Sequence, residues 1–155
     1  MTGAADALPL PVGVIVVLFL AAFPLFWCAI LWLIAAMGWR GLADAYPANS
    51  DPPDSAERVL FATLAIGATL RAANYGGAVN TWLSPSGMWL RPILPFRPFH
   101  PMVFIPWAHV RSVASERKML MTQVRVVLGG DVPDLMLSGR LAQAVLDHTK
   151  AKGRR

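Results

Sequence analysis

Residues 11–39 have the sequence PVGVIVVLFLAAFPLFWCAILWLIAAMGW, the core of a longer run from Ala7 to Trp39 without a charged side chain. A helix rises about 1.5 Å per residue, so about 20 apolar residues cross a hydrocarbon core of about 30 Å. The run exceeds that length. It predicts a transmembrane helix over residues 11–39, preceded by an N-terminal tail over residues 1–10.

Two other kinds of segment contain long apolar runs. A secretory signal begins with basic residues and has about 7–15 apolar residues before a small-residue cleavage site. Here no Lys or Arg precedes the run, which is about twice too long, although Ala35 and Ala36 resemble a cleavage site and leave a cleaved leader as an alternative. An interior helix is the other alternative, but one so long and uncharged is unusual in 155 residues. A membrane span is the favoured interpretation.

Proline, tryptophan and the flanking charges predict a kink, a boundary anchor and an orientation for this span. Pro24 lies near its middle, where a missing backbone donor predicts a kink. Trp39 and Arg40 form a suitable anchor at a membrane boundary. Because Arg40 and Arg58 follow the run and no cation precedes it, the positive-inside rule predicts an outside N-terminus and a cytoplasmic C-terminal domain.

The charges fall into three blocks. Residues 1–37 carry only Asp6, whereas residues 38–57 carry one Arg and four carboxylates, for a charge of −3. Residues 58–155 carry 13 Lys and Arg against four carboxylates, for a charge of +9. Residues 40–56 are also rich in Pro, Asp, Asn and Ser, which predicts a linker between the span and a basic domain.

A strand-rich domain is predicted over residues 57–150, with a basic tail over 151–155. Alternation in 121–128 places Val124, Val126 and Leu128 on one face, and Leu141 and Val145 share one side of a final helix. Residues 58–70 are apolar but too short for a span, so a strand is preferred there and a second membrane segment is the alternative. The predicted strands are 58–70, 78–83, 88–91, 103–107, 110–118, 121–128 and 134–137, and the predicted helix is 139–150.

Two short motifs give the domain a family resemblance. Residues 86–90 (SGMWL) form a turn, a glycine and an apolar strand, and residues 104–113 are FIPWAHVRSV. Together they resemble the bacterial pleckstrin-homology-like domains of small membrane proteins, whose strand-to-strand passage has the pattern I-P-W/Y-x-x-I-x-x-V. That family often has an acidic residue where His109 stands. The resemblance implies a small α+β domain, in which a strongly bent antiparallel sheet or partly open barrel of six or seven strands carries a C-terminal helix.

No residue pattern predicts catalysis, a cofactor or a metal. His100, His109 and His148 lack the spacing of a zinc site, and the one cysteine, Cys28, lies in the apolar run. The chain has no nucleophile elbow and no glycine-rich phosphate loop. Its Lys and Arg are spread along the domain without a nucleic-acid motif. We therefore expect neither an enzyme, with its small-molecule substrate, nor a nucleic-acid-binding protein.

The favoured hypothesis is a single-pass protein of the bacterial inner membrane. Its cytoplasmic domain would act as a scaffold or accessory subunit by binding a protein partner or by self-assembly. The first alternative, which the family resemblance also allows, is a module that docks on lipid headgroups; the second is an enzyme. The loop of basic residues that binds phosphoinositides is missing, so no headgroup site is transferred from the family. The residues predicted to face the membrane interface or lipid are Trp39, Arg40, Arg91, Arg97, Lys150, Lys152, Arg154 and Arg155.

Overall fold

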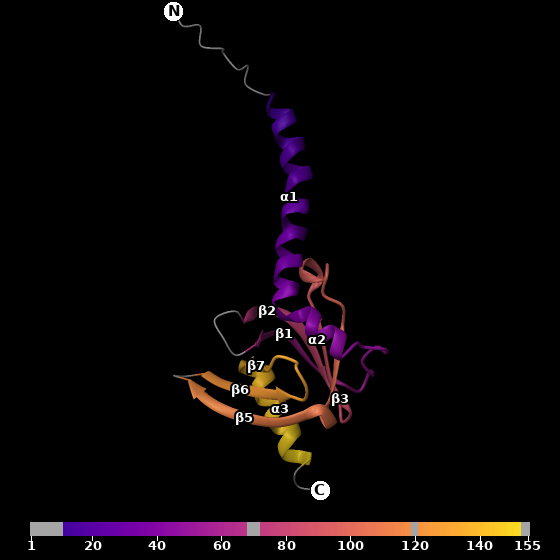
Figure 1. Cartoon of the computed structure of the whole chain (residues 1–155), viewed down its shortest axis with the longest axis vertical. Helices are drawn as coiled ribbons and strands as arrows, with labels where there is room; N and C mark the ends of the chain where they lie inside the picture. Colours follow the sequence, from indigo (N-terminus) through magenta and orange to yellow (C-terminus); the bar gives the residue numbers. More distant parts are fainter. Residues whose placement is uncertain (1–10, 68–71, 119–120, 153–155) are drawn as a thin grey trace, which may run out of the picture. The chain divides into compact units, whose positions relative to one another are not determined.

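The structure is a computed structural model that describes residues 11–67, 72–118 and 121–152. An N-terminal helix, α1, is followed by a π-helical turn over Ala35–Trp39 and by the short helix α2. Seven strands and a last helix, α3, complete the chain, with single 3-10 turns at Leu94–Phe96 and Trp107–His109 (Figure 1). The bounds are α1 Val12–Ile34, α2 Arg40–Ala45, β1 Glu57–Ile66, β2 Ala73–Leu83, β3 Gly87–Pro92, β4 Val103–Pro106, β5 Val110–Lys118, β6 Met121–Leu128, β7 Leu135–Ser138 and α3 Gly139–Lys152.

The seven strands form one sheet in the order β4-β3-β2-β1-β7-β6-β5, and every neighbouring pair is antiparallel. The sheet is strongly curled into a half-barrel and carries α3, as Figure 1 shows. This shape is that of a pleckstrin-homology-like domain. The predicted fold class is confirmed, with seven strands and a C-terminal helix.

The chain divides into two compact units, and the second begins at Leu31. The described part of the first unit contains most of α1, up to Ile30, and is apolar and almost entirely exposed. In the described residues, one helix is long and apolar enough to cross a membrane, with a mean hydropathy of 2.8 in its most apolar window. The alternative of a second span at 58–70 is wrong over Glu57–Ile66, because that segment is a strand paired with β2 and β7.

Alternation of apolar side chains determines which faces enter the core. Val124, Val126 and Leu128 of β6 are all buried, as their spacing predicted, and so are Leu141 and Val145 of α3. These side chains join one core cluster with residues of the other strands. Burying side chains of this size stabilises a domain by about 1.5–3 kcal/mol each.

The segment predicted to be a linker, residues 40–56, packs onto the domain along much of its length. Leu42, Ala43 and Tyr46 are buried in the core cluster. The amide of Phe104 donates to the carbonyl of Tyr46 at 3.0 Å, and that of Ala48 donates to Met102 at 3.3 Å. Residues 46–48 therefore cover the outer edge of β4, whereas residues 49–55 are mostly exposed and contain no helix or strand.

Helical geometry is lost at Gly38, whereas α1 is helical through Pro24, near which the sequence predicted a kink. A Cβ atom at position 38 would lie 2.8 Å from Cγ2 of Ile66, which is buried in β1. That distance is too short for two carbon atoms, so the helix end approaches β1 this closely because residue 38 is glycine.

Candidate interaction surfaces

Trp39 joins the helix end to the domain. Its side chain is completely buried, and its indole Nε1–H donates to the carbonyl of Pro101 at 2.9 Å. Its ring centroid lies 5.2 Å from that of Tyr75 and 5.4 Å from that of His100. The prediction that Trp39 faces the membrane interface is therefore corrected, because the change of direction at Gly38 turns the indole into the domain.

Tyr75 and His100 form a buried hydrogen-bonded pair next to this tryptophan. The Tyr75 hydroxyl lies 3.0 Å from Nε2 of His100, and Nδ1 of His100 lies 2.8 Å from the carbonyl of Pro98. A carbonyl only accepts, so Nδ1 carries the proton and Nε2 accepts from the hydroxyl. Burial lowers the pKa of His100, the hydrogen bond to Pro98 opposes this, and the charge of Arg40 lowers it further. Burial also raises the pKa of Tyr75, so both groups are neutral at pH 7.

Residues 93–101, here called the proline loop, place large apolar side chains in solvent beside this pair. Leu94 is 71% exposed and Phe99 is 46% exposed, and Phe99 has a φ of 64°. Arg97 lies between them and is also exposed. The loop and the helix end enclose a hollow of about 220 Å³, whose lining includes Leu31, Ile34, Phe96 and His100.

A bulge in β1 places a second pair of large apolar side chains in solvent. Pairing between β1 and β2 shifts register between Val59 and Ala62, and the residues between them, Leu60 and Phe61, are 53% and 66% exposed. We call Leu60 and Phe61 the bulge pair. Phe61 has a φ of 52°, and its amide donates to Oδ1 of Asn80 at 3.2 Å, which holds the bulge in place.

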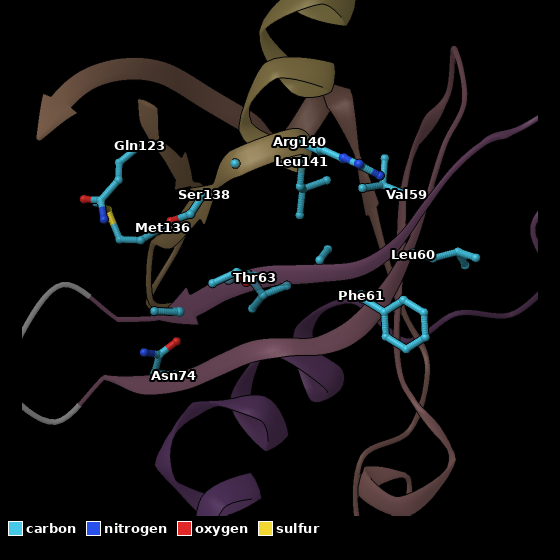
Figure 2. Close-up of a pocket in the computed structure, with 14 residues that line it drawn as sticks. Val59, Leu60, Phe61, Thr63, Asn74, Gln123, Met136, Ser138, Arg140 and Leu141 are labelled. Carbon is cyan, nitrogen blue, oxygen red and sulfur yellow. The ribbon is translucent and has the colours of Figure 1, made fainter. Parts of the chain in front are cut away.

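The bulge pair borders a groove of about 370 Å³, called here the sheet groove (Figure 2). The groove follows β1 and β7 to the start of α3. Figure 2 shows Leu60 and Phe61 at one end and Asn74 and Gln123 at the other. Apolar lining comes from Val59, Leu60, Phe61, Met136 and Leu141, and polar lining from Thr63, Asn74, Gln123, Ser138 and Arg140. Arg140 is the single charged residue in this lining.

The predicted interfacial cations divide between the helix end of the domain and the end of α3. Arg97 belongs to the proline loop, and Arg40 stacks on Trp32 at 4.7 Å from the ring centroid. Arg91 is half-buried on β3. Nε of Arg97 donates to the carbonyl of Pro92 at 3.4 Å, so Arg97 and Arg91 lie near the same end of β3.

Lys150 lies near the C-terminal end of α3, at the other end of the domain. His148, two residues earlier, is 3.5 Å from Glu57, the first residue of β1, whereas Gly38 contacts Ile66, the last. Ten strand residues span about 30 Å. Figure 1 likewise shows α2 and the end of α3 on opposite sides of the domain. The side chain of Lys152, and Arg154 and Arg155, lie outside the described residues.

The sequence interpretation missed the bulge pair, the sheet groove and the apolar side of the proline loop. A signal for the bulge was present, because Val59, Leu60 and Phe61 are three consecutive large apolar residues. Consecutive apolar residues on a strand must point to opposite faces unless a bulge re-aims one of them. In the described ranges, no group of three or more His, Cys, Asp or Glu residues is placed to hold a metal ion.

Comparison with known proteins gives no match to a family, to a curated protein or to a solved structure. The half-barrel with its helix is pleckstrin-homology-like in shape, and the candidate surfaces rest on their own geometry.

Proposed function

We propose that this protein is a membrane-anchored interaction module, a scaffold or accessory subunit that binds a segment of another protein in the sheet groove. One observation carries the proposal: the bulge pair exposes two large apolar side chains beside the groove from a backbone in an unfavourable conformation.

The bulge costs the domain stability. A non-glycine residue in the left-handed region costs about 1–2 kcal/mol, and Leu60 and Phe61 gain little from burial. The hydrogen bond from Phe61 to Asn80 maintains the conformation, as does the bond from the amide of Gly77 to the hydroxyl of Thr63 at 3.0 Å. Strained backbone and exposed apolar pairs that are held in this way are typical of binding sites.

The lining of the groove suggests the chemistry of the partner. Apolar contact is offered by Leu60, Phe61 and Met136, and neutral polar groups lie between them. The one charge in the lining is the guanidinium of Arg140, which pairs well with a carboxylate. The best fit is a protein segment with large apolar residues and a neighbouring Asp or Glu. A second copy of the chain is a competing occupant.

We place this module at the cytoplasmic face of a bacterial inner membrane, with the N-terminus outside. Support comes from the apolar helix, from the cations that follow it and from the half-barrel shape. The alternative, a module that binds lipid headgroups through all the predicted cations, is weaker, because Lys150 lies at the opposite end of the domain from Arg40.

Photo-crosslinking in the native membrane tests the groove. A benzophenone amino acid replaces Leu60 in one variant and, as a control, Arg111 of β5 in another. We expect a discrete adduct at position 60 that is absent at position 111. Adding Phe61→Asp should remove the adduct, whereas the matched Phe99→Asp should leave it.

Three results would overturn the proposal. Equal adducts at both positions would show no preference for the groove. An adduct insensitive to Phe61→Asp would place the partner elsewhere. An adduct with the mass of two copies would make the groove a self-assembly surface instead of a site for another protein.

A further inference from the structure

The second exposed apolar pair, Leu94 and Phe99, lies in the proline loop and requires an occupant of its own. We infer that the proline loop inserts into the interface of the bilayer that α1 spans, so that the domain is seated on the membrane instead of hanging from its helix. The inference rests on the proposed membrane anchoring and is independent of the sheet groove.

Contacts with the helix end place the loop near the membrane. Leu31 and Ile34, in the last turn of α1, line the same hollow as Phe96 and His100 of the loop. Trp39 donates to Pro101 at the end of the loop. The final turns of a spanning helix lie at the boundary between hydrocarbon and headgroups. A loop packed on those turns lies at the same depth.

The side chains of this region suit a headgroup layer. Leu94 and Phe99 are exposed, with the exposed Arg97 between them, and Trp32 is exposed beside Arg40. Apolar and aromatic residues next to cations are typical of segments that insert about 5–10 Å below an anionic surface. The sequence contains no Asp or Glu from residue 58 to residue 115, so no carboxylate of this stretch repels lipid phosphates.

The loop is ordered before any insertion. Its prolines fix their φ angles, and the amide of Ile93 donates to Ala78 at 2.9 Å. The amide of His100 donates to Arg97 at 2.9 Å, and its ring bonds to Pro98. The apolar pair is therefore presented at a small further cost in conformational entropy, which favours insertion.

Depth-dependent fluorescence quenching tests the inference on the full chain. In a Cys28→Ala background, one cysteine at a time replaces Leu94, Phe99, Leu60 or Leu18, and each carries a polarity-sensitive fluorophore. The vesicles contain equal parts of phosphatidylethanolamine and phosphatidylglycerol, with a nitroxide on the acyl chain near the headgroup. Labels at positions 94 and 99 should be quenched several-fold more than the label at position 60, an equally apolar and exposed site.

Position 18, in the N-terminal half of α1, separates the possible failures. Quenching at 18 without quenching at 94 and 99 would overturn the inference and leave the anchor intact. No quenching at 18 would overturn the membrane anchoring and this inference with it. Equal quenching at 60, 94 and 99 would show that the whole domain lies on lipid and would overturn selective insertion.

Two substitutions complete the test. Phe99→Asp should reduce quenching at position 94, and the matched Phe61→Asp should not. Near-ultraviolet circular dichroism checks that both variants fold. If one variant does not fold, the quenching pattern of the chain without either substitution still tests whether the proline loop inserts. A label at 94 that is shielded only after native membrane proteins are added would assign the loop to a protein and overturn the inference.

Discussion

Phe61 and Phe99 share a left-handed backbone conformation but lie in different surroundings. Phe61 and Phe99 are the non-glycine residues with positive φ in the described part of the chain, and both are exposed. Phe61 belongs to a bulge on a paired strand and borders a groove with polar lining. Phe99 belongs to a proline loop that is tied to the helix end through Trp39 and His100.

The comparison shows that exposure alone does not identify a partner. Side chains around Phe61 offer hydrogen-bonding groups and one guanidinium, which suit a peptide with defined donors and acceptors. Around Phe99 the exposed groups are apolar or cationic, which suits a headgroup layer with no fixed geometry. The neighbours of each phenylalanine, more than the ring itself, determine what it can bind.

The largest expected effect is that of Trp39→Ala, because it removes a completely buried indole and its bond to Pro101. We expect the free energy of unfolding to fall by about 3–5 kcal/mol, measured on the full chain in detergent by denaturant titration. Amide exchange should accelerate more over residues 93–101 than over residues 57–62.

Trp39→Phe is the matched control, since it keeps most of the packing and loses the bond to Pro101. Its cost should be smaller than that of the alanine variant. If amide exchange in Trp39→Ala accelerated equally at the proline loop and at the bulge, Trp39 would not stabilise the loop selectively.

Gly38→Ala should have the next largest effect. Its Cβ would lie 2.8 Å from Ile66, so the helix end or β1 must shift, at a cost of about 1–3 kcal/mol. The control is Gly41→Ala, where the added Cβ meets no atom within 4 Å. Thermal unfolding in detergent compares the two, and equal melting temperatures would show that the close approach to β1 is not needed.

Acid should destabilise the proline loop more than the bulge. We expect this effect to be smaller than those of the Trp39 and Gly38 substitutions. Burial lowers the pKa of His100 below its ordinary 6.5, so the unfolded chain takes up the proton first as the pH falls. Neutral His100 contributes fully to the free energy of unfolding at pH values above the pKa that its side chain has in the unfolded chain. This contribution is lost as the pH falls below that pKa. Protection factors of loop amides should therefore drop between about pH 7 and about pH 5.

His100→Gln is the control for this titration, because a neutral amide replaces the imidazole. Its loop protection should be lower at neutral pH and should change less with acid. A loop protection factor in the wild type that is constant over the same range would exclude His100 as the acid-sensitive group.

The smallest expected effects are those of Phe61→Gly and Phe99→Gly. Each relieves a left-handed conformation that costs about 1–2 kcal/mol, and the added freedom of the unfolded chain offsets about 0.4–1 kcal/mol of that gain. Unfolding free energies should therefore rise slightly or stay unchanged, even though a large side chain is lost. A clear loss of stability in one variant would show that this phenylalanine ring packs against the folded domain. The two phenylalanines would then not be equivalent.

Much of the fold could be predicted from short-range patterns. Alternation at Val124, Val126 and Leu128 predicted the buried face of β6, and the strands predicted over residues 78–83 and 88–91 are paired neighbours in the sheet. These features depend on neighbours in the sequence, which a single chain displays directly.

The remaining features depend on contacts between distant segments. Residues 40–48 have the composition of a linker, yet α2 enters the core and Tyr46 pairs with β4, because that edge offers unpaired backbone groups. Trp39 has the residue type of a membrane anchor, but Gly38 redirects it toward Tyr75 and His100. The bulge pair was missed because the register shift needs the partner strand to define it.

The covered edge of β4 sets a limit on assembly. Residues 46–48 already bond to β4, which leaves β5 as the open terminal strand of the described sheet. Sheets that join edge to edge in a filament need two free edges on every subunit. Two subunits that each have one free edge leave no free edge once they are paired. Strand-to-strand association through the open edge at β5 would therefore be complete at two copies.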